Sequence, residues 1–204
     1  MTPEQTANEP IKMFSYVVDH DTGYAPNPYH KLCTLVGCMY NKSENSAKFN
    51  PRRNNIVELA KKGNWIVGLG GKSERSSGQG TIIYAMQVTD ILPLKEYCQR
   101  HTNRADAKPA PHQPWRRALI SNDYYYFGNQ KHELEPAIYD QLKVRRRFKN
   151  RFTEKFIKDF VSWLRKQKRP KTIEPCDASR TKQTKGEERN GKNIFTQCRC
   201  KCRP

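Results

Sequence analysis

Three titratable side chains follow one another directly after a strand-like run near the N-terminus. Asp19, His20 and Asp21 come behind an apolar segment that ends at Val18. Two carboxylates and an imidazole can perform general acid–base catalysis, and the same groups can ligate a metal. No second group of His or Cys at ligand spacing supports a metal, and strand alternation would turn His20 away from both aspartates. These residues are candidate catalytic groups, but we favour a structural role in which the aspartates shape the following turn.

Aromatic and amide side chains follow in the same loop. Residues 22–30 contain one glycine and two prolines, which excludes a helix and predicts a shaped loop. Aromatic faces and an amide can hold an unstacked base by stacking and by hydrogen bonds to its edge. We therefore predict Tyr24, Asn27 and Tyr29 as ligand contacts, with the tyrosines as stacking residues. Trp65 and the aromatic run at 124–127 are further candidates, although Trp65 lies within a strand and is better explained as core.

A strand that ends in glycines is the second segment with chemical potential. Gly68, Gly70 and Gly71 precede Lys72 in GLGGKS, which partly matches a phosphate-binding P-loop. That motif needs another glycine where this chain has Ile66, and it leads into a helix, whereas a polar loop and a strand follow here. The pattern thus argues against a nucleoside triphosphate site. The glycines allow either a bend at the strand end or the approach of a ligand to the backbone, with Lys72 beside it.

The positive charge of the chain is concentrated in its C-terminal third. Residues 143–204 contain 21 Lys or Arg and 6 Asp or Glu, whereas residues 1–142 contain 17 and 14. Such asymmetry indicates nucleic-acid binding, with DNA favoured over RNA, and the alternative is a solvated face. The candidate phosphate contacts are Arg145, Arg146, Arg147, Lys149, Arg151, Arg165, Lys166, Lys168 and Arg169.

Seven cysteines and no secretory signal argue against a disulfide framework and favour the cytoplasm. Cys33 and Cys38 lie in an apolar run and are predicted to be buried thiols. Cys198, Cys200 and Cys202 could hold a soft metal, with Cys176 as a fourth ligand, but their spacing is unlike that of paired zinc ligands. We expect no cofactor and an oxidation-prone tail. No run approaches the roughly 20 apolar residues that span a bilayer, so no membrane contact is expected.

The hydrophobic pattern predicts an α+β domain with about six strands and four helices. Strands are expected at 13–18, 32–39, 65–69, 81–89, 117–121 and 124–127, and helices at 51–62, 93–98, 135–147 and 153–168. Asn54 or Asn55 caps the first helix, and the last presents an aromatic face that is predicted to be core. The strands suit a compact, mainly antiparallel sheet or a small barrel with flanking helices. We divide the chain into a flexible tail at 1–11, a domain at 12–169 and a disordered, basic, Cys-containing tail at 170–204.

Four segments together resemble the nucleotide modification associated domain 2 family of prokaryotic and phage proteins. They are SYVVDHDTGYAPNPY from Ser15, GNWIVGLGGK from Gly63, YAMQVTDILPLKEY from Tyr84 and LISNDYYYFG from Leu119. The resemblance covers roughly residues 14–165 and leaves the basic tail outside. Asn64 stands where family members commonly carry an aspartate, and the segment between Tyr97 and Trp115 is short. The strand order also resembles small PUA-like barrels that bind modified bases.

The resemblance implies a role in nucleic-acid base modification. The expected function is a module that binds nucleic acid or a modified base or nucleotide. One alternative is an enzyme that modifies a nucleotide or base, with Asp19, His20 or Asp21 as acid–base groups. A second is a phage or defence-system protein whose basic arm binds an acidic protein partner.

Overall fold

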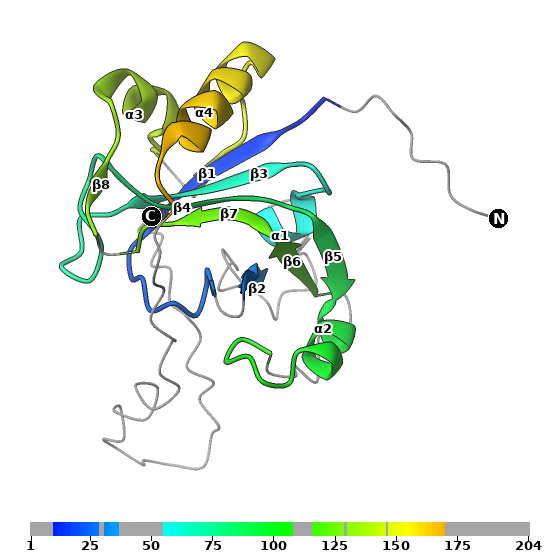
Figure 1. Ribbon diagram of the computed structural model, residues 1–204. Helices are drawn as coiled ribbons and strands as arrows, with labels where there is room; N and C mark the ends of the chain where they lie inside the picture. Colours follow the sequence, from blue (N-terminus) through cyan, green and yellow to red (C-terminus); the bar gives the residue numbers. More distant parts are fainter. Residues whose placement is uncertain are drawn as a thin grey trace, which may run out of the picture.

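Thirteen helices and strands make up the described part of the chain in the computed structural model (Figure 1). The structure describes residues 10–28, 31–36, 55–107, 116–128, 130–145 and 147–169. The predicted tail at 170–204 therefore lies outside the described residues, as do residues 1–9 of the predicted N-terminal tail. In chain order the elements are β1 (Met13–Val18), β2 (Cys33–Val36), α1 (Ile56–Leu59), β3 (Trp65–Gly70), β4 (Thr81–Gln87), β5 (Asp90–Pro93), α2 (Leu94–Arg100), β6 (Arg117–Ser121), β7 (Asp123–Tyr126), β8 (His132–Glu133), α3 (Pro136–Leu142), β9 (Phe148–Lys149) and α4 (Glu154–Lys166).

Six of the strands form one mixed sheet in the order β7–β4–β3–β1–β9, with β8 paired to β4. Strands β1 and β3 are parallel, in register from Met13 opposite Trp65 to Val18 opposite Gly70. All the other pairs in this sheet are antiparallel. A parallel pair requires a long crossover, and here the crossover contains β2 and α1. The two parallel strands consequently end side by side at the same edge of the sheet.

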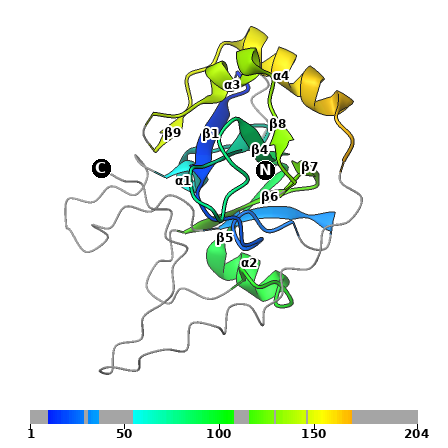
Figure 2. The same cartoon turned by 90° about the vertical axis from the view of Figure 1, so that its left-hand side faces the viewer.

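The remaining three strands form a smaller antiparallel sheet in the order β2–β6–β5. Figures 1 and 2 show α3 and α4 on one side of the six-stranded sheet, and the three-stranded sheet with α2 on the other. In each sheet the first and last strands do not pair with each other, so the described strands do not close into a barrel. The α+β fold with mainly antiparallel strands is confirmed, and the barrel alternative is not formed.

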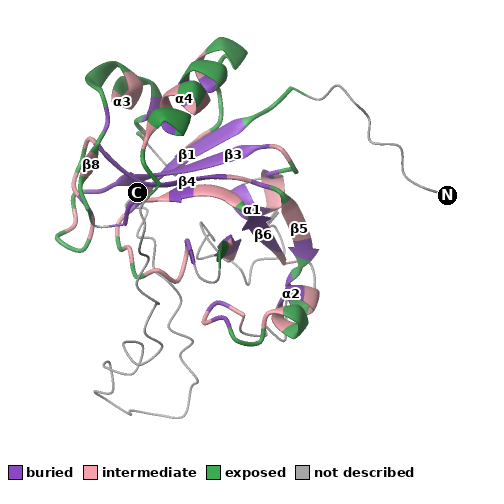
Figure 3. Cartoon of the chain, viewed as in Figure 1, coloured by how far each residue is buried: buried purple, intermediate pink, exposed green. Residues whose placement is uncertain are grey.

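The large sheet is buried on both faces, as Figure 3 shows. Met13, Trp65 and Val67 pack under the helices against Phe160 of α4, whereas the opposite face packs against the small sheet. Continuous apolar runs are typical of strands that are covered on both sides, and this explains why β3 and β4 lack a polar alternation. Trp65, with 2% exposure, is core as predicted.

All four predicted helices differ in their bounds from those observed. The helix α4 spans Glu154–Lys166 where 153–168 was predicted, and α1 ends at Leu59, three residues before the predicted end. The first described turn of α1 begins at Ile56, because the Asn55 side chain accepts a hydrogen bond from the backbone N–H of Val57 at 2.8 Å and so caps the helix. The helix α2 extends to Arg100, two residues beyond the prediction. The helix predicted at 135–147 ends at Leu142, so its last part is wrong.

Three short strands were missed by the sequence pattern: β5, β8 and β9. Two of them have only two residues each, too few to show a period. The strand β9 pairs with the outer edge of β1, where Ser15 and Tyr16 lie opposite Lys149 and Phe148. This pairing covers part of an edge that would otherwise be unpaired. The rest of the predicted strand at 32–39 beyond Val36 lies outside the described residues, as does Cys38.

Candidate functional site

Two polar loops meet where the parallel strands β1 and β3 end. The Ser76 hydroxyl donates to the backbone carbonyl of Val18 at 2.6 Å and accepts the backbone N–H of Gly71 at 2.7 Å. The backbone N–H of Asp21 also donates to the carbonyl of Arg75 at 3.3 Å. These bonds fix the loop after β1, residues 19–28, against the loop after β3, residues 71–80. In parallel sheets the carboxyl ends of strands are the usual place for ligand sites.

The three glycines of this region are packed against protein atoms. A Cβ at Gly68 would collide with the ring of Tyr84, and a Cβ at Gly70 would collide with the Gly78 carbonyl. A Cβ at Gly71 would lie 2.6 Å from a carboxylate oxygen of Asp19. Of the two interpretations of these glycines, the geometry favours the structural one, because each allows close packing of a side chain or loop at the strand end.

Asp21 is the best-positioned titratable group of the site. The Tyr126 hydroxyl lies 2.8 and 2.7 Å from its two carboxyl oxygens, and the Gly23 N–H donates to Oδ1 at 3.1 Å. The last bond shapes the turn, as the structural interpretation predicted. Burial raises the pKa of Asp21, while the Tyr126 and Gly23 hydrogen bonds lower it by a smaller amount. The net direction is upward, so this carboxyl retains a proton to a higher pH than an exposed aspartate does.

His20 has one nitrogen engaged by the backbone. Its Nδ1 lies 2.5 Å from the carbonyl oxygen of Asp19 and 3.3 Å from the Ser73 hydroxyl. A carbonyl oxygen can only accept, so Nδ1 carries the hydrogen and the neutral ring has its lone pair on Nε2. The side chain is exposed, and Nε2 is therefore the nitrogen available to accept a proton.

The aromatic run at 124–127 divides between the two faces of the sheet. Tyr125 and Phe127 are buried under α4, whereas Tyr124 and Tyr126 lie on the opposite face. The Tyr124 hydroxyl donates to the Pro28 carbonyl at 3.3 Å, so this face contacts the loop after β1 at two points. Strand alternation predicted that about half of these side chains are core, but not which half. Nothing in the sequence indicated the contact between Tyr126 and Asp21.

The predicted base-contacting residues are not equivalent in the structure. Tyr24 is half-buried, and Tyr29 lies outside the described residues. Asn27 is fully buried and forms a β-bridge with Thr34. Its backbone carbonyl and side-chain oxygen accept hydrogen bonds from Arg104 at 2.8 and 3.1 Å. Lys72 is exposed at the start of the second loop.

A buried polar network that the sequence analysis missed holds the loop after β1 in place. Arg104 and Asp106 form an ion pair with side-chain exposures of 1% and 0%, and the Tyr97 hydroxyl donates to Asp106 at 2.8 Å. Thr34 also donates to the Asp106 carboxylate. Arg104 and Asp106 come from a segment whose hydrophobic residues show no periodicity. No pattern in the sequence therefore indicated that this oppositely charged pair is buried, and charged residues are rarely buried unless they are paired.

Cys33 is buried next to this network, as predicted. Burial raises the pKa of its thiol well above the ordinary range, with the Arg104 charge opposing the shift. The thiol is therefore protonated and unreactive at neutral pH.

Within the described residues, no group of three or more His, Cys, Asp or Glu side chains is arranged to hold a metal ion. The cysteines near the C-terminus, Cys176, Cys198, Cys200 and Cys202, lie outside those residues. None of the helices in the described ranges has an apolar stretch of membrane-spanning length.

The sequence profile of the nucleotide modification associated domain 2 family matches residues 10–116 and 112–182. The chain belongs to this family. The match confirms the resemblance and extends beyond Pro170, so the first part of the basic tail belongs to the matched region, contrary to the expectation that all of it lies outside. No curated protein and no solved structure matches the chain significantly. The family description connects the protein with nucleotide modification.

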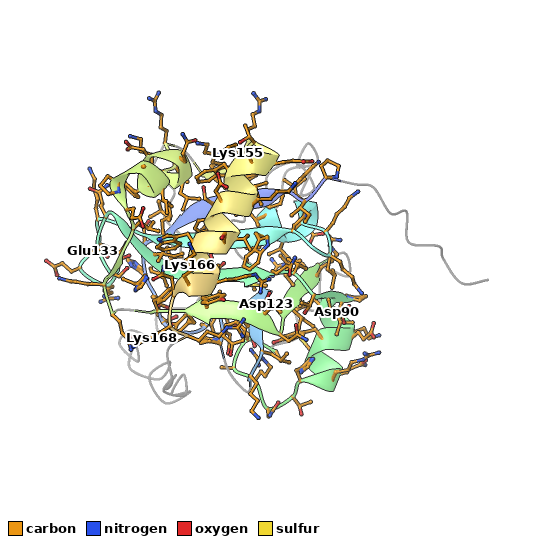
Figure 4. All side chains as sticks on the ribbon, turned by 45° about the horizontal axis from the view of Figure 1, so that its top comes forward. Asp90, Asp123, Glu133, Lys155, Lys166 and Lys168 are labelled. Carbon is orange, nitrogen blue, oxygen red and sulfur yellow. The ribbon has the colours of Figure 1, made fainter. Side chains whose placement is uncertain are left out.

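The predicted phosphate contacts of this nucleotide modification associated domain fall into two groups. Arg145, Arg147 and Arg151 are exposed around the edge strand β9, where Lys149 contacts the ring of Phe152 at 5.0 Å. Arg146 lies outside the described residues. The second group surrounds the end of α4, where Figure 4 shows Lys166 and Lys168, and comprises Arg165, Lys166, Lys168 and Arg169. Arg165 and Arg169 both pair with Asp123, at 3.3 and 2.7 Å.

Proposed function

We propose that this protein is a module that binds nucleic acid or a modified base in a nucleotide-modification system. The family membership supports the nucleotide-related context. The observation that carries the binding proposal is the half-buried carboxyl of Asp21, held by the Tyr126 hydroxyl where the loops after β1 and β3 meet. A fixed carboxyl and hydroxyl at a strand end are suited to hydrogen bonding with the edge of a base.

The chemistry of Asp21 favours a ligand that donates hydrogen bonds. An ionised carboxylate has about four acceptor positions, and Tyr126 and Gly23 leave part of this capacity unused. The exocyclic amino groups of cytosine, adenine and guanine are the donors that a base edge offers. Tyr24, half-buried in the same loop, supplies the aromatic face for stacking.

The electrostatic part of binding comes from the C-terminal third of the chain. Arg145, Arg147 and Arg151 are exposed, and no ion pair joins them to a described residue. Such side chains contact phosphates independently of sequence and supply the salt-dependent share of the affinity. We propose DNA as the principal partner, and the experiment below includes RNA as its comparison.

A second candidate function is an enzyme that acts on a nucleotide or base. The position of His20 favours it, because its Nε2 is exposed in the loop that also carries the Asp21 carboxyl with its raised pKa. An exposed imidazole and a carboxyl whose pKa is raised are the types of group that general acid–base catalysis uses.

A binding screen against modified and unmodified DNA and RNA oligonucleotides tests the proposal. We expect binding that Asp21→Ala and Tyr126→Phe weaken by roughly 10- to 150-fold, as for the loss of a charged hydrogen bond. The matched control is Tyr124→Phe, which removes the hydroxyl of a neighbouring half-buried tyrosine that contacts only a backbone carbonyl in the described chain. Equal effects of the two tyrosine changes would contradict a special role for Tyr126.

Mass spectrometry of the same oligonucleotides after incubation separates a binding module from an enzyme. The binding proposal predicts unchanged nucleosides. Conversion of a base that disappears in His20→Ala, with oligonucleotide affinity retained, would establish the second candidate function instead.

A further inference from the structure

Two arginines at the end of α4 converge on one carboxylate. Arg165 and Arg169 approach the two different oxygens of Asp123, at 3.3 and 2.7 Å. The Arg169 guanidinium also lies 4.7 Å from the ring centre of Tyr125, which orients it over the sheet. We call Asp123, Arg165 and Arg169 the two-arginine cluster. Two guanidinium groups around two oxygens form an arrangement that suits a phosphate as well as a carboxylate.

The cluster is open to solvent and lies in a positive environment. The side chains of Arg165 and Arg169 are 55% and 53% exposed, and Asp123 is 21% exposed. Lys166 and Lys168 are exposed in the same segment of the chain, and Figure 4 labels both. Two of the four cations in this segment pair with Asp123 at the carboxyl end of a helix, where the helix dipole further favours positive charge. An exposed ion pair of this kind is weak, so a second anion can compete for the arginines.

The cluster also lies close to the proposed base-binding residues. Asp123 and Tyr126 are the first and last residues of β7, and a strand rises about 3.3 Å per residue, so their backbones are roughly 10 Å apart. Tyr125, which contacts Arg169, faces α4, whereas Tyr126 faces the opposite side of the sheet. A nucleic-acid strand therefore reaches both sites by passing around β7, the strand at the end of the sheet order.

We infer that the two-arginine cluster is a phosphate site for nucleic acid in which Asp123 is an internal competitor of the phosphate. This inference rests on the proposed function. It assigns Arg165 and Arg169 a backbone phosphate as ligand, and it assigns Asp123 a function that weakens binding. A purely structural role of the three residues, holding the end of α4 on β7, predicts that loss of Asp123 lowers stability and leaves affinity unchanged or reduced.

The test measures affinity for an oligonucleotide that the wild-type protein binds in the screen above. We expect Asp123→Asn, which keeps the size of the side chain, to bind about 2- to 5-fold more tightly, the effect of removing weak exposed ion pairs. On duplex DNA the log–log salt dependence should steepen by about 0.9, corresponding to one more neutralised phosphate. Asp123→Ser serves as a second variant if the first folds poorly.

The matched control is Asp140→Asn, which removes an exposed carboxylate that pairs with Lys143 at 2.7 Å elsewhere on the surface. It changes the net charge equally and should leave affinity almost unchanged. The Arg165→Gln and Arg169→Gln double variant should bind more weakly, and adding Asp123→Asn to it should give no further gain.

Three outcomes overturn the inference. Affinity of Asp123→Asn equal to or below that of wild type leaves no competing role for Asp123. An equal gain from Asp140→Asn attributes the effect to net charge. A gain from Asp123→Asn that persists without both arginines shows that phosphate is not bound by them. Each of these results leaves the proposed function standing, whereas a wild-type protein that binds no oligonucleotide overturns both.

Discussion

Asp21 shows how one side chain can shape a turn and also have a perturbed pKa. Its Oδ1 accepts the Gly23 N–H and so shapes the turn, while Tyr126 contacts both carboxyl oxygens. Burial nevertheless raises the pKa, because the charged form loses more hydration than these bonds return. Buried carboxyls with raised pKa values are concentrated at functional sites, although structural networks also produce them.

The raised pKa of Asp21 makes stability depend on pH with a definite sign. At low pH both the folded and the unfolded chain hold the proton, and the cost of burying the charge is absent. As the pH rises, the unfolded chain loses its proton first, so the free energy of unfolding falls until the pH passes the folded-state pKa. Asp21→Asn should therefore melt close to wild type at about pH 3 and at a higher temperature than wild type at about pH 7. Calorimetry over this pH range measures both melting temperatures. A difference between the variant and wild type that does not change with pH would contradict a raised pKa of Asp21.

Gly68 is a position where a single added methyl group should be poorly tolerated. An added Cβ would overlap the ring of Tyr84, whose hydroxyl lies 2.8 Å from that of Tyr16 in the core. Overpacking of a core typically costs about 1–3 kcal/mol, so we expect Gly68→Ala to lower the free energy of unfolding by this amount. Urea unfolding measures it. The control is Gly78→Ala, which meets no atom within 4 Å but carries the strain of a positive φ of 100°.

The loop after β1 is held by tertiary contacts from several elements. Ser76 and Arg75 in the loop after β3 fix its beginning, and Arg104 in the segment after α2 fixes its end at Asn27. The described part of the segment between Tyr97 and Trp115 supplies the buried ion pair of this network. The network therefore connects the small sheet to the candidate site.

Breaking the buried ion pair should be far more costly than breaking an exposed one. Asp106→Asn leaves Arg104 buried without its counter-charge, and we expect a loss of about 3–5 kcal/mol in the free energy of unfolding. The matched control is Asp90→Asn, because Asp90 pairs with Lys62 at 2.7 Å with side-chain exposures of 43% and 61%. That change should cost less than about 1 kcal/mol. Similar losses from the two variants, measured by urea unfolding, would show that the Arg104 pair is not essential to the fold.

At the scale of the whole molecule, most of the positive charge lies on or next to the folded domain. Residues 143–169 contain 12 Lys or Arg and two acidic residues, whereas residues 170–204 contain nine and four. The larger share of the expected attraction to phosphate therefore comes from the segment around β9 and α4. The remainder comes from the C-terminal segment, part of which falls within the family match.

Deletion of residues 170–204 should flatten the salt dependence of nucleic-acid binding without abolishing it. Each lost phosphate contact on duplex DNA reduces the log–log slope by about 0.9. Replacing Arg145, Arg147 and Arg151 by Gln in the full chain should reduce the slope further, by an amount that corresponds to roughly two to three phosphate contacts. Titrations at several salt concentrations give both slopes. An unchanged slope after both alterations would exclude the C-terminal third as the phosphate-binding region.

The sequence alone determined the elements whose patterns are local. The strand at 13–18 and the strand at 117–121 were predicted with their observed bounds, because apolar runs between turn residues identify strands without reference to their partners. The core face of α4 and the family membership were also available from sequence, since both depend on residue order. The burial of Trp65 followed from its place within such a run.

Only the tertiary structure decided which residues meet. The parallel pairing of β1 with β3 brings the loops at 19–28 and 71–80 together, although about forty residues separate them in the chain. Tyr126 reaches Asp21, Arg104 reaches Asn27 and Arg169 reaches Asp123 only because sheet order and helix packing place them side by side. Such contacts depend on long-range geometry, and their energy comes from burial and charge pairing that have no periodicity in the sequence.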